Sequence, residues 1–154
     1  MTLGETLLQK LDRWRPGGRE TLTAAADGWT AVVTADCADQ VGCRLWEVAL
    51  RPAQPLPAAD PKARALAVAG RVTGLLEPLA LVEADADRRT AQLRSAAPAV
   101  RGDDRLYYEL LLEGNGAAML RRHQTTRQAP RREQTAFTLT HDALAKLVDD
   151  LTAC

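Results

Sequence analysis

The spacing of apolar residues changes along the chain, from a helical period at the N-terminus to a strand-like alternation after it. Thr2 and Glu5 form a capping-box pattern ahead of an apolar stripe that repeats every three or four residues. The stripe consists of Leu3, Leu7, Leu8, Leu11 and Trp14. We therefore expect a helix over about residues 3–14 that packs this stripe on another element.

Three strands are expected next. Residues 20–25 and 29–36 are rich in Thr, Val and Ala, and they flank Asp27-Gly28, whose tolerance of positive φ predicts a β-hairpin. The third strand should run from Cys43 to Arg51. Strict alternation places Trp46, Val48 and Leu50 on one face of it. It places Leu45, Glu47 and Ala49 on the other.

A second helix is predicted to begin at Pro61, because Asp60 is a good N-cap and proline is favoured at the first helical position. It is expected to run to about Leu76. Its apolar side would consist of Leu66, Ala69, Val72, Leu75 and Leu76. The same helix carries the small residues Ala63, Ala67, Gly70 and Gly74, although glycine in a helix costs about 1 kcal/mol relative to alanine. This small-residue face predicts the close approach of another backbone, either the protein's own sheet or a second helix across a homodimer contact.

Alternating residues resume after Pro78 and continue to the last helix. Strands are expected over 79–84, 90–96, 105–113, 117–125 and 131–140, with a loop at 128–130. Thr140 is predicted to cap the final helix. The order α-βββ-α-ββ-βββ-α predicts a single α+β domain over residues 1–154, with three helices and a mostly antiparallel sheet of about five to eight strands. Leu45, Leu111 and Met119 are expected opposite the core face, where something should cover them.

An Arg-rich cluster is expected across the last two strands. It consists of Arg121, Arg122, Arg127, Arg131 and Arg132. A three-residue turn at 114–116 would set Glu109 opposite Arg121 and Tyr107 opposite His123. The cluster is either a site for anions or single-stranded nucleic acid, or a solvated sheet face whose charge blocks edge-to-edge aggregation. The neighbouring glutamates Glu109, Glu113 and Glu133 favour the second interpretation.

Composition removes several classes of function without selecting one. Lys plus Arg and Asp plus Glu number 20 each, so no net charge draws the chain to nucleic acid or to a membrane. No run of about 18 apolar residues is present, and no basic segment followed by an apolar stretch resembles a signal peptide. These features predict a cytoplasmic protein. Its cysteines, Cys37, Cys43 and Cys154, are expected to be reduced thiols.

Candidate chemistry is sparse. No spacing matches a zinc site, a calcium loop, a phosphate-binding glycine loop or a nucleophile elbow. A count across the loop at 128–130 sets His123 near Glu133, where the two could imitate a general-base pair. His141 is expected to be an exposed residue at the start of the last helix. We therefore expect no catalytic residue, no metal and no cofactor.

The order of elements resembles that of the type III secretion chaperone-like proteins, which include small dimeric bacterial chaperones for secreted effectors. The resemblance covers most of the chain but rests on topology without a diagnostic motif, so no functional residue is carried over. The chain differs from the secretion chaperones in its neutral charge and in its additional strands after the middle helix. The resemblance implies a homodimer that binds peptide segments of a partner.

The sequence thus predicts a small bacterial protein that is a non-enzymatic, chaperone- or adaptor-like module for a protein or peptide partner. An anion or single-stranded nucleic-acid binder and an enzyme of unrecognised type are the alternatives.

Overall fold

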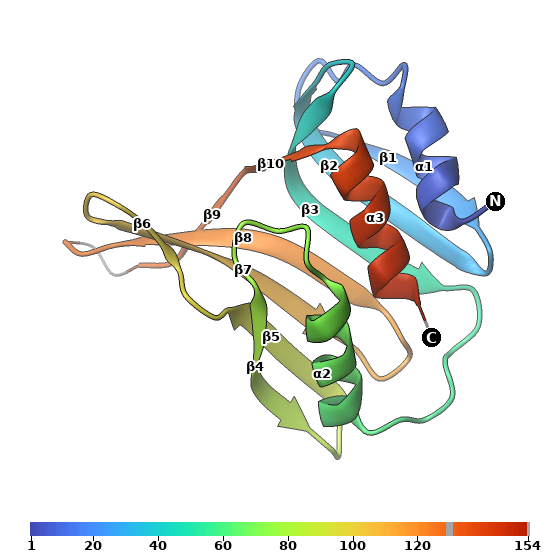
Figure 1. Ribbon diagram of the computed structural model, residues 1–154, viewed down its shortest axis with the longest axis vertical. Helices are drawn as coiled ribbons and strands as arrows, with labels where there is room; N and C mark the ends of the chain where they lie inside the picture. Colours follow the sequence, from blue (N-terminus) through green and yellow to red (C-terminus); the bar gives the residue numbers. More distant parts are fainter. Residues whose placement is uncertain (129–130, 154) are drawn as a thin grey trace.

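The computed structural model describes residues 1–128 and 131–153, so part of the expected loop at 128–130 and the third cysteine, Cys154, lie outside the described residues. Helices and strands follow one another along this part of the chain as Figure 1 shows. The helices are α1 (Leu3–Leu11), α2 (Pro61–Arg71) and α3 (His141–Thr152). The strands are β1 (Glu20–Ala26), β2 (Trp29–Ala38), β3 (Gly42–Pro52), β4 (Leu79–Asp85), β5 (Thr90–Ser95), β6 (Ala99–Arg101), β7 (Asp104–Leu112), β8 (Ala118–Thr126), β9 (Glu133–Thr135) and β10 (Phe137–Thr140).

The helices begin where their capping residues predict. The side chains of Thr2, Asp60 and Thr140 each accept a hydrogen bond from the backbone N–H three residues later, so all three predicted N-caps are confirmed. The end of α2 differs from the prediction, because the helix stops at Arg71 instead of about Leu76. Val72 leaves the helical conformation, with φ −80° and ψ 100°, and its side chain is buried in the core.

The described strands form one ten-stranded sheet in the order β1-β2-β3-β8-β7-β5-β4. In addition, β6 pairs with β7, β9 with β8, and β10 with β3. Every pairing is antiparallel, which confirms the α+β class and the antiparallel sheet. The strand number exceeds the predicted range, partly because the strand expected over 131–140 is two strands that pair with different neighbours. The chain leaves β8 after Thr135, and Phe137 and Leu139 then enter the core beside β3.

All three helices lie on one face of the sheet (Figure 1). Helix α1 packs on α3 and β1, α3 also contacts β3 and β10, and α2 packs on β4 and β5. The strand side chains beneath them form one continuous core. Its largest fully buried members from the sheet are Val33, Leu45, Val48, Leu93, Tyr108, Leu110 and Leu120. We call the opposite surface of the sheet the open face, because no described helix packs on it.

A bulge in β3 reverses two of the expected side-chain directions. Thr34 pairs with Glu47 and Ala35 pairs with Leu45, so Trp46 is an extra residue in β3. Leu45 is fully buried in the core, whereas Trp46 is half-buried and donates its indole N–H to Asp36 at 2.9 Å. The predictions that Leu45 faces away from the core and that Trp46 shares a face with Val48 are therefore wrong. A pattern of strict alternation does not reveal a bulge, since the extra residue is set by the partner strand.

Candidate functional site

The open face carries an apolar row that crosses four strands. Val32 of β2 pairs with Ala49 of β3, which pairs with Met119 of β8. Met119 in turn pairs with Leu111 of β7. We call these four residues the apolar row, and all four are half-buried, between fully buried neighbours on their own strands. The prediction that Leu111 and Met119 lie opposite the core is confirmed.

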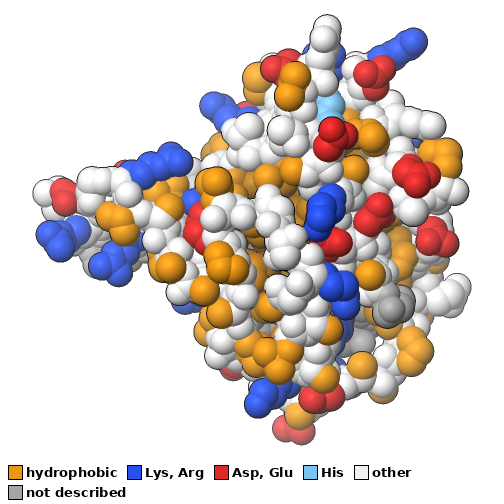
Figure 2. All heavy atoms as spheres, in the orientation of Figure 1, with side chains coloured by type: hydrophobic (Ala, Val, Ile, Leu, Met, Phe, Trp, Pro, Cys, Tyr) orange, Lys and Arg blue, Asp and Glu red, His pale blue; other side chains and the backbone are white. Residues whose placement is uncertain are grey.

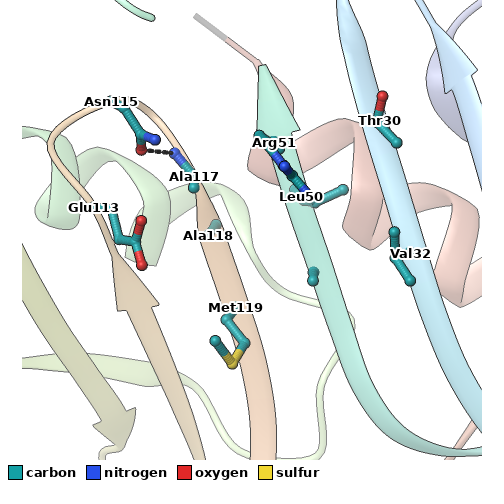
Figure 3. Close-up of a pocket in the computed structure, with 10 residues that line it drawn as sticks. Thr30, Val32, Leu50, Arg51, Glu113, Asn115, Ala117, Ala118 and Met119 are labelled. Carbon is teal, nitrogen blue, oxygen red and sulfur yellow. Dashed lines mark hydrogen bonds between the residues drawn. The ribbon is translucent and has the colours of Figure 1, made fainter. Parts of the chain in front are cut away.

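A hollow of about 300 Å³ lies at the β2–β3–β8 end of the apolar row (Figure 3). Val32, Ala49 and Met119 contribute its apolar lining. Polar side chains at the end of the sheet that carries the β7–β8 turn also border it, namely Thr30, Arg51, Glu113 and Asn115. Because alanine and valine leave more room than the larger side chains around them, the sheet is hollowed here.

A charged row runs beside the apolar row, two residues further along each strand. Arg121 donates to Glu47 from Nε at 2.9 Å, and its terminal nitrogen lies 2.8 Å from the same carboxylate. Arg121 pairs in the strand register with Glu109, as predicted, and Glu109 pairs with Arg94. The order across β3, β8, β7 and β5 is therefore negative, positive, negative, positive. Opposite charges on neighbouring strands stabilise the sheet.

Glu109 is the centre of a cluster of cationic and polar side chains, although only 5 % of it is exposed. Arg132 reaches its two carboxylate oxygens at 2.7 and 3.2 Å, and Arg94 Nε lies 3.4 Å away. Gln92 donates a further hydrogen bond at 3.0 Å. The ring of Tyr107 lies beside this group, 5.4 Å from the Arg94 guanidinium. We call these residues, together with His123, the Glu109 cluster.

His123 lies within the Glu109 cluster with both ring nitrogens buried and without a hydrogen-bond partner. Its Nε2 atom is 3.7 Å from the Glu109 carboxylate. Burial lowers the pKa of the imidazole below its ordinary value, and the neighbouring charge of Arg132 lowers it further. The ring is therefore neutral at neutral pH.

The predicted proximity of His123 to Glu133 is wrong. His123 pairs with Gln134, and Glu133 pairs with Gln124, so their side chains belong to opposite faces at this point of the sheet. His141 is also placed differently from the prediction, because it is buried, and its backbone N–H donates to the Val41 carbonyl at 2.8 Å. The direct passage from β10 into α3 holds it against the loop before β3.

Arg122 does not belong to the open face. Its guanidinium is buried on the helix-covered side, where it lies 3.1 Å from Glu77 and 4.2 Å from the ring centre of Tyr108. Ser95 donates to Glu77 at 3.0 Å and accepts from the Tyr108 backbone N–H at 2.8 Å. This network fastens the loop after α2 to β5, β7 and β8, and its role is structural.

The five arginines predicted as one anion-binding cluster are thus divided among three places. Arg121 and Arg132 are paired on the open face, and Arg122 is buried beneath the helices. Arg127 and Arg131 are exposed near the outer end of β8. Of the glutamates expected to neutralise the cluster, Glu109 does so. The carboxylates of Glu47 and Glu77 were missed, because they come from segments distant in sequence that only the sheet order brings close.

The small-residue face of α2 points outward. Ala63, Ala67, Gly70 and Gly74 are all exposed, and a side chain added at Gly70 or Gly74 would meet no atom within 4 Å. The prediction that the protein's own sheet packs against these glycines is therefore wrong, and Gly74 lies in the loop after the helix. Leu66 on the same helix is 54 % exposed.

The remaining chemical groups do not assemble into a site within the described residues. No group of three or more His, Cys, Asp or Glu side chains there could hold a metal ion. Cys37 and Cys43 are free thiols, and burial raises the pKa of Cys43 to about 11, which keeps it protonated. No helix in the described ranges combines the length and the apolar character needed to cross a membrane.

Comparison with protein-family models, with curated proteins and with solved structures finds no match for this chain. The fold and the open face together define a small α+β protein with an antiparallel sheet that helices cover on one side only.

Proposed function

We propose that this protein is a non-enzymatic module, chaperone- or adaptor-like and cytoplasmic, that binds a protein or peptide partner on its open face. One observation carries the proposal. All three helices cover the same face of the sheet, so the apolar row and its adjoining hollow remain uncovered on the other. A sheet of this type can leave a face for a partner, and half-buried apolar side chains on such a face favour one.

The shape of the open face favours a protein segment over a small substrate. The apolar row spans four strands, which is about 14 Å at the usual spacing between strands. Paired charges border it on one side, in an arrangement that resembles the apolar centre and polar rim of protein interfaces. A segment lying across the strands would contact the row along its whole length.

The proposal is tested by replacing a residue of the apolar row. Tagged wild-type protein and the Met119→Asp variant are used to capture partners from native lysate, and we expect the captured protein to be lost with Met119→Asp. Val100→Asp is the matched control, because Val100 is 67 % exposed on β6, away from the apolar row. Circular dichroism confirms that both variants are folded. Capture that is unchanged by Met119→Asp would overturn the proposal.

We further propose that the protein is a homodimer through the outer side of α2. Ala63, Ala67 and Gly70 are exposed there beside Leu66, so a second helix could approach closely without displacing any side chain of the first. Light scattering should give about twice the chain mass of 16.7 kDa. Gly70→Leu and Gly74→Leu should shift the protein toward the monomer. A strict monomer at high concentration, unaffected by both substitutions, contradicts the dimer.

Anion or single-stranded nucleic-acid binding is a second candidate, supported by a different observation. The arm formed by β6 and the adjoining ends of β7 and β8 projects from the body, and Lys or Arg side chains gather on it in Figure 2. Arg101, Arg105, Arg127 and Arg131 are exposed in this region. Salt-sensitive retention on heparin that Arg127→Glu and Arg131→Glu abolish would support this function. Retention that survives both reversals would exclude it.

A further inference from the structure

The Glu109 cluster holds one more positive charge than its carboxylates neutralise. Arg94 and Arg132 share the single carboxylate of Glu109, while Glu47 neutralises Arg121. Glu109 is almost inaccessible, but 42 % of the Arg94 side chain and 44 % of the Arg132 side chain are exposed. A molecule that approaches this part of the open face therefore meets two guanidinium groups before it meets the carboxylate beneath them.

Two further observations indicate that the cluster has unused capacity for hydrogen bonds. The Nε atom of Arg94 is buried and makes no hydrogen bond, and the same holds for both ring nitrogens of His123. His123 is a polar side chain with 6 % exposure whose Nε2 faces the Glu109 carboxylate. Buried polar groups without partners are uncommon in proteins, and they are usually accounted for by strain, by water or by a function.

We propose that Arg94 and Arg132 form a receptor for one carboxylate of the bound segment, whose apolar side chain enters the hollow beside Ala49. The inference rests on the proposed function of the open face and adds the chemistry of its partner. Arginine binds carboxylates through paired N–H groups, and two guanidiniums above a buried glutamate present such groups outward. The ring of Tyr107 forms a wall beside them.

The positions of the two subsites define the spacing of the partner's residues. The hollow lies at β3 and β8, and Arg94 lies on β5, two strands from β8 and two residues further along the strands. This displacement is on the order of 12 Å from the usual strand geometry. In the partner it corresponds to about three or four residues of extended chain or to about two helical turns.

A partner with one acidic residue fits the charges of the face better than a nucleic acid does. The surplus at the cluster is a single charge, and Glu47 and Glu113 lie on either side of the apolar row. A nucleic-acid backbone would bring several phosphates over these carboxylates, which opposes binding. A single carboxylate on a mostly apolar segment neutralises the surplus without that repulsion.

The test is to select binders from a random peptide library on the purified protein. Peptides that bind the wild type and are lost with Met119→Asp are binders of the open face. We expect these to carry Asp or Glu at a fixed spacing from an apolar residue. Arg94→Gln should lower their affinity about tenfold, in line with the loss of a charged hydrogen bond, and should abolish the acidic preference in a fresh selection. Replacing the acidic residue of a selected peptide by Gln or Asn should produce the same loss on the wild type.

Arg13→Gln is the matched control, because Arg13 is exposed just after α1, on the side of the sheet that the helices cover. It should leave both affinity and preference unchanged. Arg94→Gln leaves Arg132 on Glu109, so the fold is expected to persist, and the melting temperature checks this.

Each alternative result has a distinct meaning. Peptides that depend on Met119 but show no acidic preference overturn the carboxylate receptor and leave the proposed function standing. The absence of any Met119-dependent peptide overturns both. A twelve-nucleotide oligo-dT that binds more tightly than the selected peptides, and loses binding with Arg94→Gln, overturns the receptor in favour of nucleic acid.

Discussion

Individual charged residues differ in this protein according to the face on which they lie. Arg121 and Arg122 are adjacent in sequence, yet Arg121 is part of the solvent-accessible charged row and Arg122 is buried beneath the helices. A strand alternates its side chains, so neighbours in sequence meet different dielectric environments. The exposed pair with Glu47 is expected to contribute little to stability, whereas the buried pair with Glu77 is sensitive to the loss of one partner.

The buried pair gives the first prediction. Arg122→Met leaves the Glu77 carboxylate without its cation, and it should reduce the free energy of unfolding by about 3 to 5 kcal/mol. The double variant Arg122→Met with Glu77→Gln should lose less than the single variant, since no uncompensated charge remains. Urea denaturation measures both. Arg121→Met is the control on the neighbouring position, and equal losses for the two single variants would contradict the argument.

His123 gives a prediction for pH. Burial lowers the pKa of its imidazole below the ordinary 6.5, so the folded state binds fewer protons than the unfolded state as the pH falls. The stability associated with the neutral ring is therefore present above about pH 6.5 and is lost as the pH falls through that value toward the folded-state pKa. The free energy of unfolding of His123→Gln should depend less on pH than that of the wild type between pH 7.5 and 5. Parallel curves for the two proteins would show that His123 does not titrate in this way.

At the scale of elements, two helical glycines, Gly70 of α2 and Gly4 of α1, lie in opposite surroundings. Gly70 on α2 has open space around its missing side chain. A Cβ on Gly4 of α1 would instead come too close to Asp149 and to the Ala145 carbonyl of α3. Gly4 thus permits the close contact between α1 and α3, and its N–H donates to Asp149 at 2.8 Å. The sequence predicted that another backbone approaches the glycines of α2. Within the chain, such a close approach occurs at Gly4 of α1 instead.

Replacing each of these glycines by alanine should therefore have opposite effects on the free energy of unfolding. At protein concentrations low enough to keep the chain monomeric, Gly70→Ala should raise the free energy of unfolding by about 0.5 to 1 kcal/mol, because alanine is the better helix former and no atom of the same chain obstructs it. Gly4→Ala should lower the same quantity, because the helices must separate. Thermal or urea unfolding of the two variants beside the wild type makes the comparison. A loss of stability with Gly70→Ala in the monomer would contradict the open surroundings of Gly70 within the chain.

On the scale of the whole molecule, the sheet has a short central seam. Strands β3 and β8 pair through three residues on each side, from Val48↔Leu120 to Leu50↔Ala118. The helices reinforce this seam, since Arg71 at the end of α2 donates to the carbonyls of Asp150 and Ala153 at the end of α3. The core beneath runs continuously across it.

The continuous core predicts that both halves of the sheet unfold together. All three tryptophans precede β4, so their fluorescence reports the first half, and amide hydrogen exchange at Leu93 and Leu110 reports the second. The two probes should give the same free energy of unfolding. Leu120→Ala should lower both values by about 2 to 5 kcal/mol. Separate transitions would show that the seam divides the chain into two independent units.

Local signals in the sequence determined much of this architecture. The caps at Thr2, Asp60 and Thr140 located the helix starts, and the turn at 114–116 set the register that pairs Glu109 with Arg121. The position of Leu111 and Met119 opposite the core followed from alternation. These features depend on interactions between residues close in sequence, which a single chain reveals by its pattern.

Only the tertiary structure decided what the arginines do and where the open site lies. Glu47 and Glu77 reach Arg121 and Arg122 through a sheet order that places β3 beside β8 and the loop after α2 beneath the helices. The bulge at Trp46 and the division of residues 131–140 between two strands depend on the same long-range pairing. Charge and burial are properties of the assembled surface, so the sequence supplied the residues of the open face and the fold determined which of them remain available to a partner.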